Sequence, residues 1–427
     1  MKKISFILFG ILMMSVLAAC SSGDDKEASG DGEVVELKLW TDWTEDRPEN
    51  TVYKDIIAKF NEEHEDINII IESIPHDDYE VKLRTQAAGK QLPDLMRVWP
   101  GTRVAPLVEG GALLPLNSII DNWKDVIPDA ILQDYAVDGN YYAIPSNISE
   151  TSLIFYNKEL VKQAGYATFP TTYEELKGLI EALNDSGITP IALGNKALWP
   201  LQSVYISTIA DRFTGSEFLE NVLNGDGTFV NDQFISALSV VGELNKLGAF
   251  NEDMNTIDEA QSRNEFIKGS AAMHFAGSWA IGPILDSVEN VDNIGVSAFP
   301  SFEGGEGDQE KIAGVAGGGI AVNSNLSEKE QEAAFEFLKY FYSEEMYQQL
   351  VKANIVVPAI VEMDDSIPQI FKDANSFAQN GLSPVYDATL TPELTDIINN
   401  GLQSITIGEK TPEELAEEMQ KELEASR

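Results

Sequence analysis

The 427-residue chain is poor in cysteine and histidine, and each shortage narrows the chemistry open to it. Cys20 is the single cysteine, so an internal disulfide is excluded and the fold must depend on its hydrophobic core. The histidines are scattered at His64, His76 and His274, and none pairs with Cys20 at the spacing of metal ligands. We therefore expect neither a metal site nor a cofactor.

Positive charge is also scarce. Lysine and arginine number 29 against 70 aspartates and glutamates, which gives a formal net charge of −41. Such a chain is repelled by phosphates and by anionic lipid headgroups, so nucleic-acid binding and membrane adhesion through basic patches are excluded. We interpret the acidic residues as a solvated surface, in preference to a site for a cationic ligand.

A largely apolar run stands at the start of the chain, from Ile4 to Ala19, behind Lys2 and Lys3. It is too short to span a membrane comfortably, and its charged beginning and small final residues are typical of an export signal. The polar, acidic and glycine-rich stretch that follows predicts a flexible tether. We expect a signal peptide over residues 1–19 and the tether over residues 20–32.

The end of this run is more specific. Leu17, Ala18, Ala19 and Cys20 resemble the lipobox of bacterial lipoproteins. That resemblance implies that Cys20 becomes the new N-terminus and carries lipid, so that the tether joins a membrane anchor to a folded body. The alternative is an ordinary cleaved signal beside a chance cysteine.

After position 33 the pattern alternates between strand and helix. Val35, Leu37 and Leu39 alternate with charged residues and predict a strand, and strand patterns return in "INIIIESI" and "PDLMRVW" with helical patterns between them. This rhythm indicates βαβ units, a largely parallel sheet and an α/β fold, without the fixed period of a solenoid. Such sheets bind ligands beyond the carboxyl ends of their strands, where we expect the loops at 41–46 and 99–103 and the loop before "LLPLN".

Two later helices carry start signals. "TTYEELKGLIEALNDSG" predicts a helix capped by Thr171 or Thr172 and stopped by Gly187. "SEKEQEAAFEFLKYFYSEEMYQQLV" predicts one long amphipathic helix with Ser327 as its cap.

Ordered landmarks run along nearly the whole chain after the tether. They are "LKLWTDWT", "GKQLPDLMRVW", "EGGALLPLN", "DGNYYAIPSNISETSLIFYNKELVKQAG", "FIKGSAAMHFAGSWA", "GVSAFPSFEGG" and "GVAGGGIAVNSN". In these segments and in their order, the chain resembles the extracellular solute-binding proteins of ABC transporters, family 1, the family of the maltose-binding protein.

The resemblance implies a two-lobe fold of the periplasmic-binding-protein type (type II), with discontinuous lobes hinged around a ligand cleft. We place the N-terminal lobe at 33–147 plus 297–342 and the C-terminal lobe at 148–296 plus 343–427. The implied function is capture of a carbohydrate, with an oligosaccharide favoured, and delivery to the permease subunits of an ABC transporter. The implied protein is a monomer without catalytic residues, anchored at the extracellular face of the cell membrane, or on the periplasmic side if the cell is Gram-negative.

A sugar presents hydroxyl groups and a weakly apolar C–H face, so a sugar site combines polar side chains with aromatic rings. Asp42 and Trp43 on the first loop and Trp99 at the end of the third strand are candidates, with Trp40 assigned to the core. Arg97 is left open between a structural ion pair and a hydroxyl donor.

Other candidates come later in the chain. Trp199 stands before a helix, where packing and ligand contact are equally consistent with the sequence. Gly317 and Gly318 would let backbone amides approach a ligand closely, since no Cβ intervenes. The family resemblance adds the carboxylate of Glu150 and the rings of Trp279 and Tyr386 as sugar contacts. Their alternatives are an exposed strand-end charge for Glu150 and a core position for Trp279.

Two other classes of function stay open at this stage. A secreted glycoside hydrolase would also need aromatics and carboxylates in a cleft, but no local motif marks an acid and a nucleophile. A binding protein for an amino acid or a polyamine would suit acidic loops. The stretch 224–232, "NGDGTFVND", superficially resembles a calcium loop but lacks the terminal glutamate.

Overall fold

The structure of the protein is a computed structural model that describes residues 34–359, 361, 367–378 and 380–427. The expected export signal, the tether and Cys20 lie outside these described residues. Val34–Arg427 pack together as one unit. Across the described ranges, every helix falls short of the length and apolar character that a membrane crossing requires.

The first sheet joins strands from the beginning of the chain with one from much later. Its order is β2-β1-β3-β13-β6, with β1 parallel to both β2 and β3, and β13 antiparallel to β3 and β6. The strands are β1 (Val35–Thr41), β2 (Ile67–Ser73), β3 (Leu95–Val98), β13 (Gly319–Val322) and β6 (Ile144–Pro145). On β1, Val35, Leu37 and Leu39 are buried while Glu36 and Lys38 are exposed, as the alternating pattern predicts.

Helices cover this first sheet. α1 packs against β2 and α12, and α12 packs against β1 and β13. The elements are α1 (Pro48–Glu63), α2 (His76–Ala88), α3 (Ala105–Glu109), α4 (Asp129–Leu132), α12 (Glu328–Phe341) and α13 (Glu344–Lys352), with the short hairpin β4 (Ala136–Val137) and β5 (Asn140–Tyr141). Ser327 caps α12 as predicted, but the long helix expected there is broken, because Ser343 caps a separate helix through a bond from the Met346 amide.

The second sheet has the order β11-β8-β10-β9. β8 is antiparallel to β10 and β11, and β10 is parallel to β9. Thr172 forms the capping box of α6 with Glu175, in agreement with the sequence. The strands are β8 (Leu153–Asn157), β9 (Thr189–Ala192), β10 (Ala271–Ala276) and β11 (Ile294–Ala298). The surrounding helices are α5 (Lys158–Gln163), α6 (Tyr173–Asp185), α7 (Ser207–Thr214), α8 (Phe218–Asn224), α9 (Asp232–Lys246), α10 (Glu259–Ile267), α11 (Ile281–Ser287), α14 (Gln369–Ala378), α15 (Tyr386–Thr389), α16 (Pro392–Thr406) and α17 (Pro412–Ala425).

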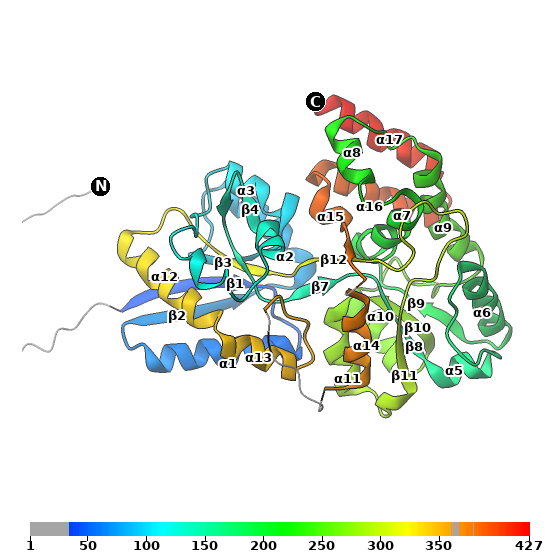
Figure 1. Ribbon diagram of the computed structural model, residues 1–427, viewed down its shortest axis with the longest axis horizontal. Coiled ribbons are helices and arrows are strands. Elements are labelled where there is room, and N and C mark those ends of the chain that lie inside the picture. The colour runs from blue at the N-terminus through cyan, green and yellow to red at the C-terminus, as the bar shows by residue number, and fades with distance from the viewer. Residues whose placement is uncertain (1–33, 360, 362–366, 379) are drawn as a thin grey trace, which may run out of the picture. The chain divides into compact units, whose positions relative to one another are not determined.

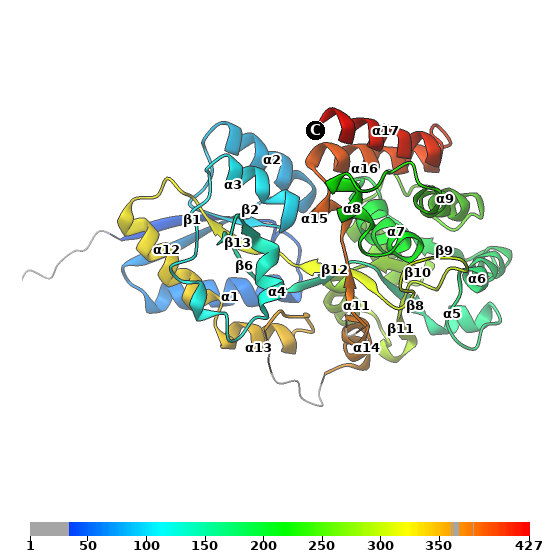
Figure 2. The same ribbon diagram turned by 45° about the horizontal axis from the view of Figure 1, so that its top comes forward.

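A third, smaller sheet connects the two larger ones. β7 (Ile148–Glu150) and β12 (Ile312–Ala316) run antiparallel, and β14 (Leu382–Ser383) pairs with β12 in parallel. Figure 1 shows β7 and β12 passing between the elements of the first sheet and those of the second, and Figure 2 shows β12 in the same place. The exact lobe limits stay a prediction. α13, which is expected in the C-terminal lobe, contacts α1, and Lys59 pairs with Glu345 there.

Candidate functional site

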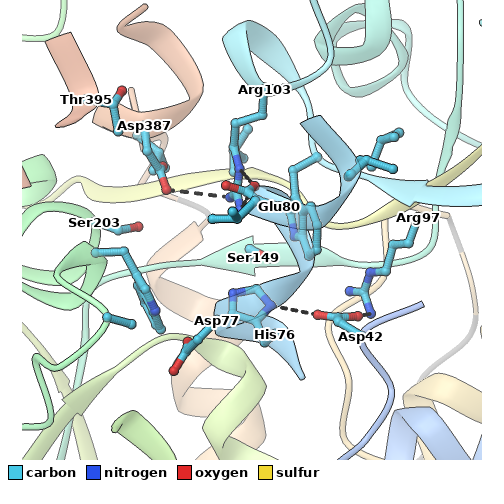
Figure 3. A pocket seen from close by; sticks show the side chains of 18 of the residues that line it. Asp42, His76, Asp77, Glu80, Arg97, Arg103, Ser149, Ser203, Asp387 and Thr395 are labelled. Atoms are coloured by element: carbon cyan, nitrogen blue, oxygen red, sulfur yellow. Dashed lines mark hydrogen bonds and ion pairs between the residues drawn. The ribbon is translucent and has the colours of Figure 1, made fainter. Parts of the chain in front are cut away.

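A cavity of about 360 Å³ lies where the loops after β1 and β3 meet helices and turns that surround the second sheet. It is the position at which α/β sheets usually bind ligands, beyond the carboxyl ends of parallel strands. The linking strand β7 and the residues on either side of it contribute alternate positions to the cavity lining, since Ser149 of β7 and its flanking residues Asn147 and Thr151 all line it. Figure 3 shows Ser149 between Arg97 and His76 on one side and Ser203 on the other.

Aromatic rings form a chain across this cavity. The ring centroids of Trp99 and His76 are 5.3 Å apart, those of His76 and Trp199 are 6.0 Å apart, and those of Trp199 and Trp279 are 5.8 Å apart. Each pair meets at a steep angle, so each ring turns an edge toward the next. The three tryptophans are half-buried, which leaves apolar ring surface open to a ligand.

The backbone before Trp279 explains how that ring reaches the cavity. Trp279 lies in the short 3₁₀ turn that follows β10. A Cβ on Gly277 would come within 2.1 Å of the Trp279 ring and 2.4 Å of the Glu150 carbonyl oxygen. Only glycine therefore lets the indole fold back over the strand end.

Replacing Gly277 by alanine is expected to displace the Trp279 ring and weaken ligand binding in this cavity about tenfold, with a loss of stability of about 1–3 kcal/mol from overpacking. Calorimetric titration and chemical denaturation measure the two effects. Gly89→Ala is the matched control, because its Cβ would meet nothing closer than 3.6 Å. Unchanged affinity in Gly277→Ala would show that the ring position does not matter for binding.

Asp42 is the centre of a buried charge cluster on one wall. Its carboxylate lies 2.8 Å from an Arg97 nitrogen and 2.7 Å from His76 Nδ1. Burial alone would raise the pKa of Asp42, but Arg97 and His76 together outweigh it and hold that pKa well below its usual range. Arg97 thus forms a structural ion pair, and Asp42 orients Arg97 and His76 at the cavity wall (Figure 3).

The Arg97 guanidinium also fits closely against the backbone. A Cβ on Gly318 would come within 2.0 Å of Arg97 Nε, and one on Gly317 within 2.5 Å of the Asn147 side chain. These glycines therefore lie behind the residues that line the cavity, and they provide the room in which Arg97 and Asn147 are held.

Ion pairs join the two walls of the cavity at two places. Arg103 follows β3 and pairs with Glu80 of α2, and it also lies 3.5 Å from the Asp387 carboxylate of α15. Elsewhere, Arg263 of α10 lies 2.8 Å from Glu45, in the loop before α1. The Arg103–Asp387 and Arg263–Glu45 ion pairs therefore connect the two walls of the cavity in this structure.

The ion pair between Glu45 and Arg263 is part of a larger network of charged residues. Arg263 also pairs with Glu259 at 2.8 Å, and Glu259 lies 3.2 Å from His274 Nε2. Burial would raise the pKa of Glu259, but Arg263 and His274 outweigh it and keep that pKa well below its usual range. His274 is therefore part of this buried network.

The structure brings four of the candidate residues together. Asp42, Trp99, Trp199 and Trp279 all line the cavity. Trp199 thus faces the cavity while its ring also packs on the edge of Trp279.

Trp43 lies elsewhere. Its side chain is 2% exposed, and its ring stacks on Tyr53 at 4.8 Å and lies parallel to Phe341 at 6.3 Å. The expectation of a cleft position thus differs from the structure, because α1 and α12 provide an aromatic core beside this loop. Trp40 is in the core as predicted, with its indole N–H donating to Glu72.

Glu150 and Tyr386 are also absent from the cavity lining. Glu150 is fully buried between the lining residues Ser149 and Thr151, and neither of its carboxylate oxygens has a hydrogen-bond partner among the described residues. Burial raises the pKa of Glu150 to about 8. Tyr386 is 2% exposed and stacks with Phe234, while its neighbour Asp387 lines the cavity.

Sequence reasoning missed His76, Arg103 and Asp387. His76 had a usable signal, since it begins the helix directly after β2, at the carboxyl edge of the sheet. Arg103 lies in the 99–103 loop that the sequence did single out. No signal in the sequence pointed to Asp387, because α15 reaches the cavity only through tertiary packing. In the part of the chain that the structure describes, no group of three His, Cys, Asp or Glu side chains is placed to hold a metal ion.

Comparisons with known proteins give the fold and site a context. A family model described as bacterial extracellular solute-binding protein matches residues 45–348. An uncharacterised ABC transporter extracellular-binding protein of Pyrococcus horikoshii is 27% identical over 65% of this chain, and the match spans 64% of that relative's length. The galactooligosaccharide-binding protein of Bacillus subtilis is 23% identical over 97% of this chain and 94% of its own.

The fold of this chain is also similar to that of a solved structure. The structure titled chitin oligosaccharide binding protein superposes with a TM-score of 0.85 at 27% identity, covering 92% of this chain and 99% of that one. The predicted two-lobe α/β fold is thereby confirmed. With the family model matching most of the sequence, the chain belongs to the bacterial extracellular solute-binding proteins, the binding components of ABC transporters.

Proposed function

We propose that the protein captures a carbohydrate, an oligosaccharide, in the cavity between its two larger sheets and delivers it to the permease subunits of an ABC transporter. The chain of half-buried rings from Trp99 through His76 and Trp199 to Trp279 is the observation that carries this proposal. Relatives named for galactooligosaccharide and chitin oligosaccharide binding support it.

The residues suit recognition of an uncharged, hydroxyl-rich ligand. Indole faces pack against the C–H face of a sugar ring, because the negative face of the π-system attracts its weakly positive hydrogens. Asn147, Ser149, Thr151 and Ser203 supply neutral donors and acceptors around the cavity. Asp42 and Arg97 neutralise one another, so the wall that they form presents little net charge.

In this proposal the ligand leaves chemically unchanged. Asp42 and Glu259 line the cavity, and both are held ionised by arginine and histidine partners. A glycosidase acid needs the opposite, a raised pKa that keeps its proton available. Burial raises the pKa of Glu49, Asp77 and Asp387, which also line the cavity, so the pKa shifts alone do not separate binding from hydrolysis. Product analysis after incubation with oligosaccharides tests this point, and the appearance of shorter sugars would favour the hydrolase.

Placement in the cell is part of the same proposal. Export through the signal at residues 1–19, lipid attachment at Cys20 and a tether at 20–32 would hold a monomeric body at the extracellular face of the membrane, or the periplasmic face of a Gram-negative cell. The lobes, 33–147 plus 297–342 and 148–296 plus 343–427, would close about the β7–β12 connection when the ligand binds.

A thermal-shift screen of the protein without residues 1–19 tests the proposal. The panel holds mono- and oligosaccharides of N-acetylglucosamine, galactose, glucose and xylose, with amino acids and polyamines beside them. A ligand present at a hundred times its Kd stabilises the folded state by about 2.7 kcal/mol, which raises Tm by several degrees. A shift with a polyamine or an amino acid and none with any sugar would contradict carbohydrate binding.

A further inference from the structure

The two lobes also meet outside the ligand cavity, where the loop before α1 and the start of α1 contact α10 and α11. Arg263 of α10 lies 2.8 Å from the Glu45 carboxylate. Gly282 of α11 lies against the ring of Pro48, the first residue of α1. The residues that line the cavity include none of these four. They therefore connect the lobe of the first sheet to the lobe of the second without taking part in the ligand site.

Gly282 fits against Pro48 because it carries no side chain. A Cβ at this position would lie 2.8 Å from Pro48 Cγ and 3.1 Å from Pro48 Cδ, and the nearest heavy atoms that it would meet all belong to this ring. A proline ring is rigid, so an alanine could be accommodated only if α11 moved away from α1. Within α11 itself, alanine would favour the helix. The constraint on this position therefore comes from the contact between the lobes.

The charges of this contact also have partners within their own lobes. Glu45 accepts two hydrogen bonds from Arg47, at 2.8 and 3.1 Å. Arg263 donates to Glu259 at 2.8 Å. If the lobes separated, the bond between Glu45 and Arg263 would break, but each charge would keep a partner. Breaking a buried ion pair is costly chiefly when it leaves a charge uncompensated, so this contact favours closed lobes and still permits them to open.

We propose that Glu45, Pro48, Arg263 and Gly282 form a latch, which stabilises the closed arrangement of the lobes and thereby sets ligand affinity without contacting the ligand. A protein whose binding-competent state is only partly populated binds more weakly in proportion to that population, so a weaker latch raises the apparent Kd. The inference goes beyond ligand capture, because it gives residues outside the cavity a role in affinity. Its binding test rests on the proposed function, whereas its conformational test needs no ligand.

The conformational test measures the distance between spin labels on the two sides of the latch. The parent protein lacks residues 1–19 and carries Cys20→Ser, so that the labels attach only at introduced cysteines. Asp55→Cys on α1 and Asp286→Cys on α11 place the labels at exposed positions. Double electron–electron resonance of the ligand-free protein then reports how far the lobes separate on this side.

Gly282→Ala and Glu45→Gln should each increase the population at long distances relative to the parent. The ion pair between Arg103 and Asp387 remains in both variants, so closure is weakened and not abolished. Gly89→Ala is the matched control, because its Cβ would meet nothing closer than 3.6 Å, and it should give the distances of the parent.

Calorimetry with the β-1,4-linked dimer of N-acetylglucosamine and with a galacto-oligosaccharide of two units measures affinity. For the sugar that binds, Gly282→Ala should raise the Kd about fivefold or more, since overpacking acts against the closed state alone. Glu45→Gln should raise it about two- to fivefold, as expected for a partly exposed ion pair. The double variant should bind about as well as Gly282→Ala alone, because the ion pair is already separated there.

The outcomes separate the latch from folding and from the proposed function. Circular dichroism of Gly282→Ala should match the parent, since alanine favours α11. Unchanged label distances in Gly282→Ala and Glu45→Gln would overturn the latch, and so would fully additive losses of affinity in the double variant, while carbohydrate capture would stand. If no sugar of the whole panel bound, the proposed function would be wrong, and the label distances would still decide whether the latch exists.

Discussion

Replacing Trp279 by alanine is expected to raise the Kd for the bound sugar about thirty- to hundredfold. The indole is half-buried, held over Gly277 and braced by Trp199 at 5.8 Å, so a sugar meets it without reordering it. Loss of the apolar contact and of the stacking costs about 2.0–2.8 kcal/mol of binding free energy, which corresponds to that change in Kd. Calorimetric titration of the variant measures it directly.

The controls separate stacking from folding. Trp279→Phe keeps an aromatic face and should lose only a few-fold in affinity, because a smaller ring still covers part of the sugar. Far-ultraviolet circular dichroism and Tm should remain close to wild type in both variants, since Trp279 is only partly buried. A Trp279→Ala protein that is folded and binds with full affinity would remove this residue from the site.

Replacing Glu150 by glutamine is expected to stabilise the protein at alkaline pH and to leave it unchanged at acid pH. Glu150 is fully buried without a hydrogen-bond partner among the described residues, and burial raises its pKa from 4.5 to about 8. The folded state therefore prefers the protonated carboxyl. The stability linked to this group is fully present below pH 4.5 and is lost as the pH rises toward about 8.

The size of the effect follows from the shift. Each unit of pKa difference corresponds to about 1.4 kcal/mol, so ionising Glu150 destabilises the fold by an amount on the order of 5 kcal/mol at most. Between pH 5 and pH 9 the Tm of wild type should fall several degrees more than that of Glu150→Gln.

Calorimetric melting across this pH range gives the comparison. Glu36→Gln is the matched control, because it removes the same formal charge from an exposed position of β1. Parallel curves for wild type and Glu150→Gln would show that the buried carboxylate gains a compensating partner on ionisation.

Local patterns in the sequence predicted much of the fold. The alternation of apolar and charged residues on β1 predicted which face of that strand is buried. Thr172 and Ser327 predicted where α6 and α12 begin. The pattern did not reveal the break between α12 and α13, because residues 327–351 keep a helical periodicity throughout. Tyr342 leaves the helical conformation where its hydroxyl bonds the Ile320 amide and its carbonyl accepts from Trp123, and both partners are remote in sequence.

Some residues of the candidate site could also be predicted from the sequence, and others could not. Loop position identified Asp42 and Trp99 as cavity residues, since the ends of strands can be read locally, and the family resemblance identified Trp279. The sequence did not reveal that Trp43 lies in the core while Trp279 faces the cavity. The core position of Trp43 depends on its packing against Tyr53 and Phe341. Glu150 was expected at the ligand, but its neighbours in the chain, Ser149 and Thr151, take the lining positions.

By itself, the sequence determined the acidic character of the chain, the α/β class, the order of its elements and the family to which it belongs. These depend on composition, on periodicity over a few residues and on short ordered motifs. Only the tertiary structure decided which tryptophans face the cavity, that Arg103 meets Asp387, and that Glu150 lies buried without a partner among the described residues. Those outcomes depend on contacts between segments up to several hundred residues apart, because a side chain's environment is set by whatever packs against it, and local sequence does not encode its partners.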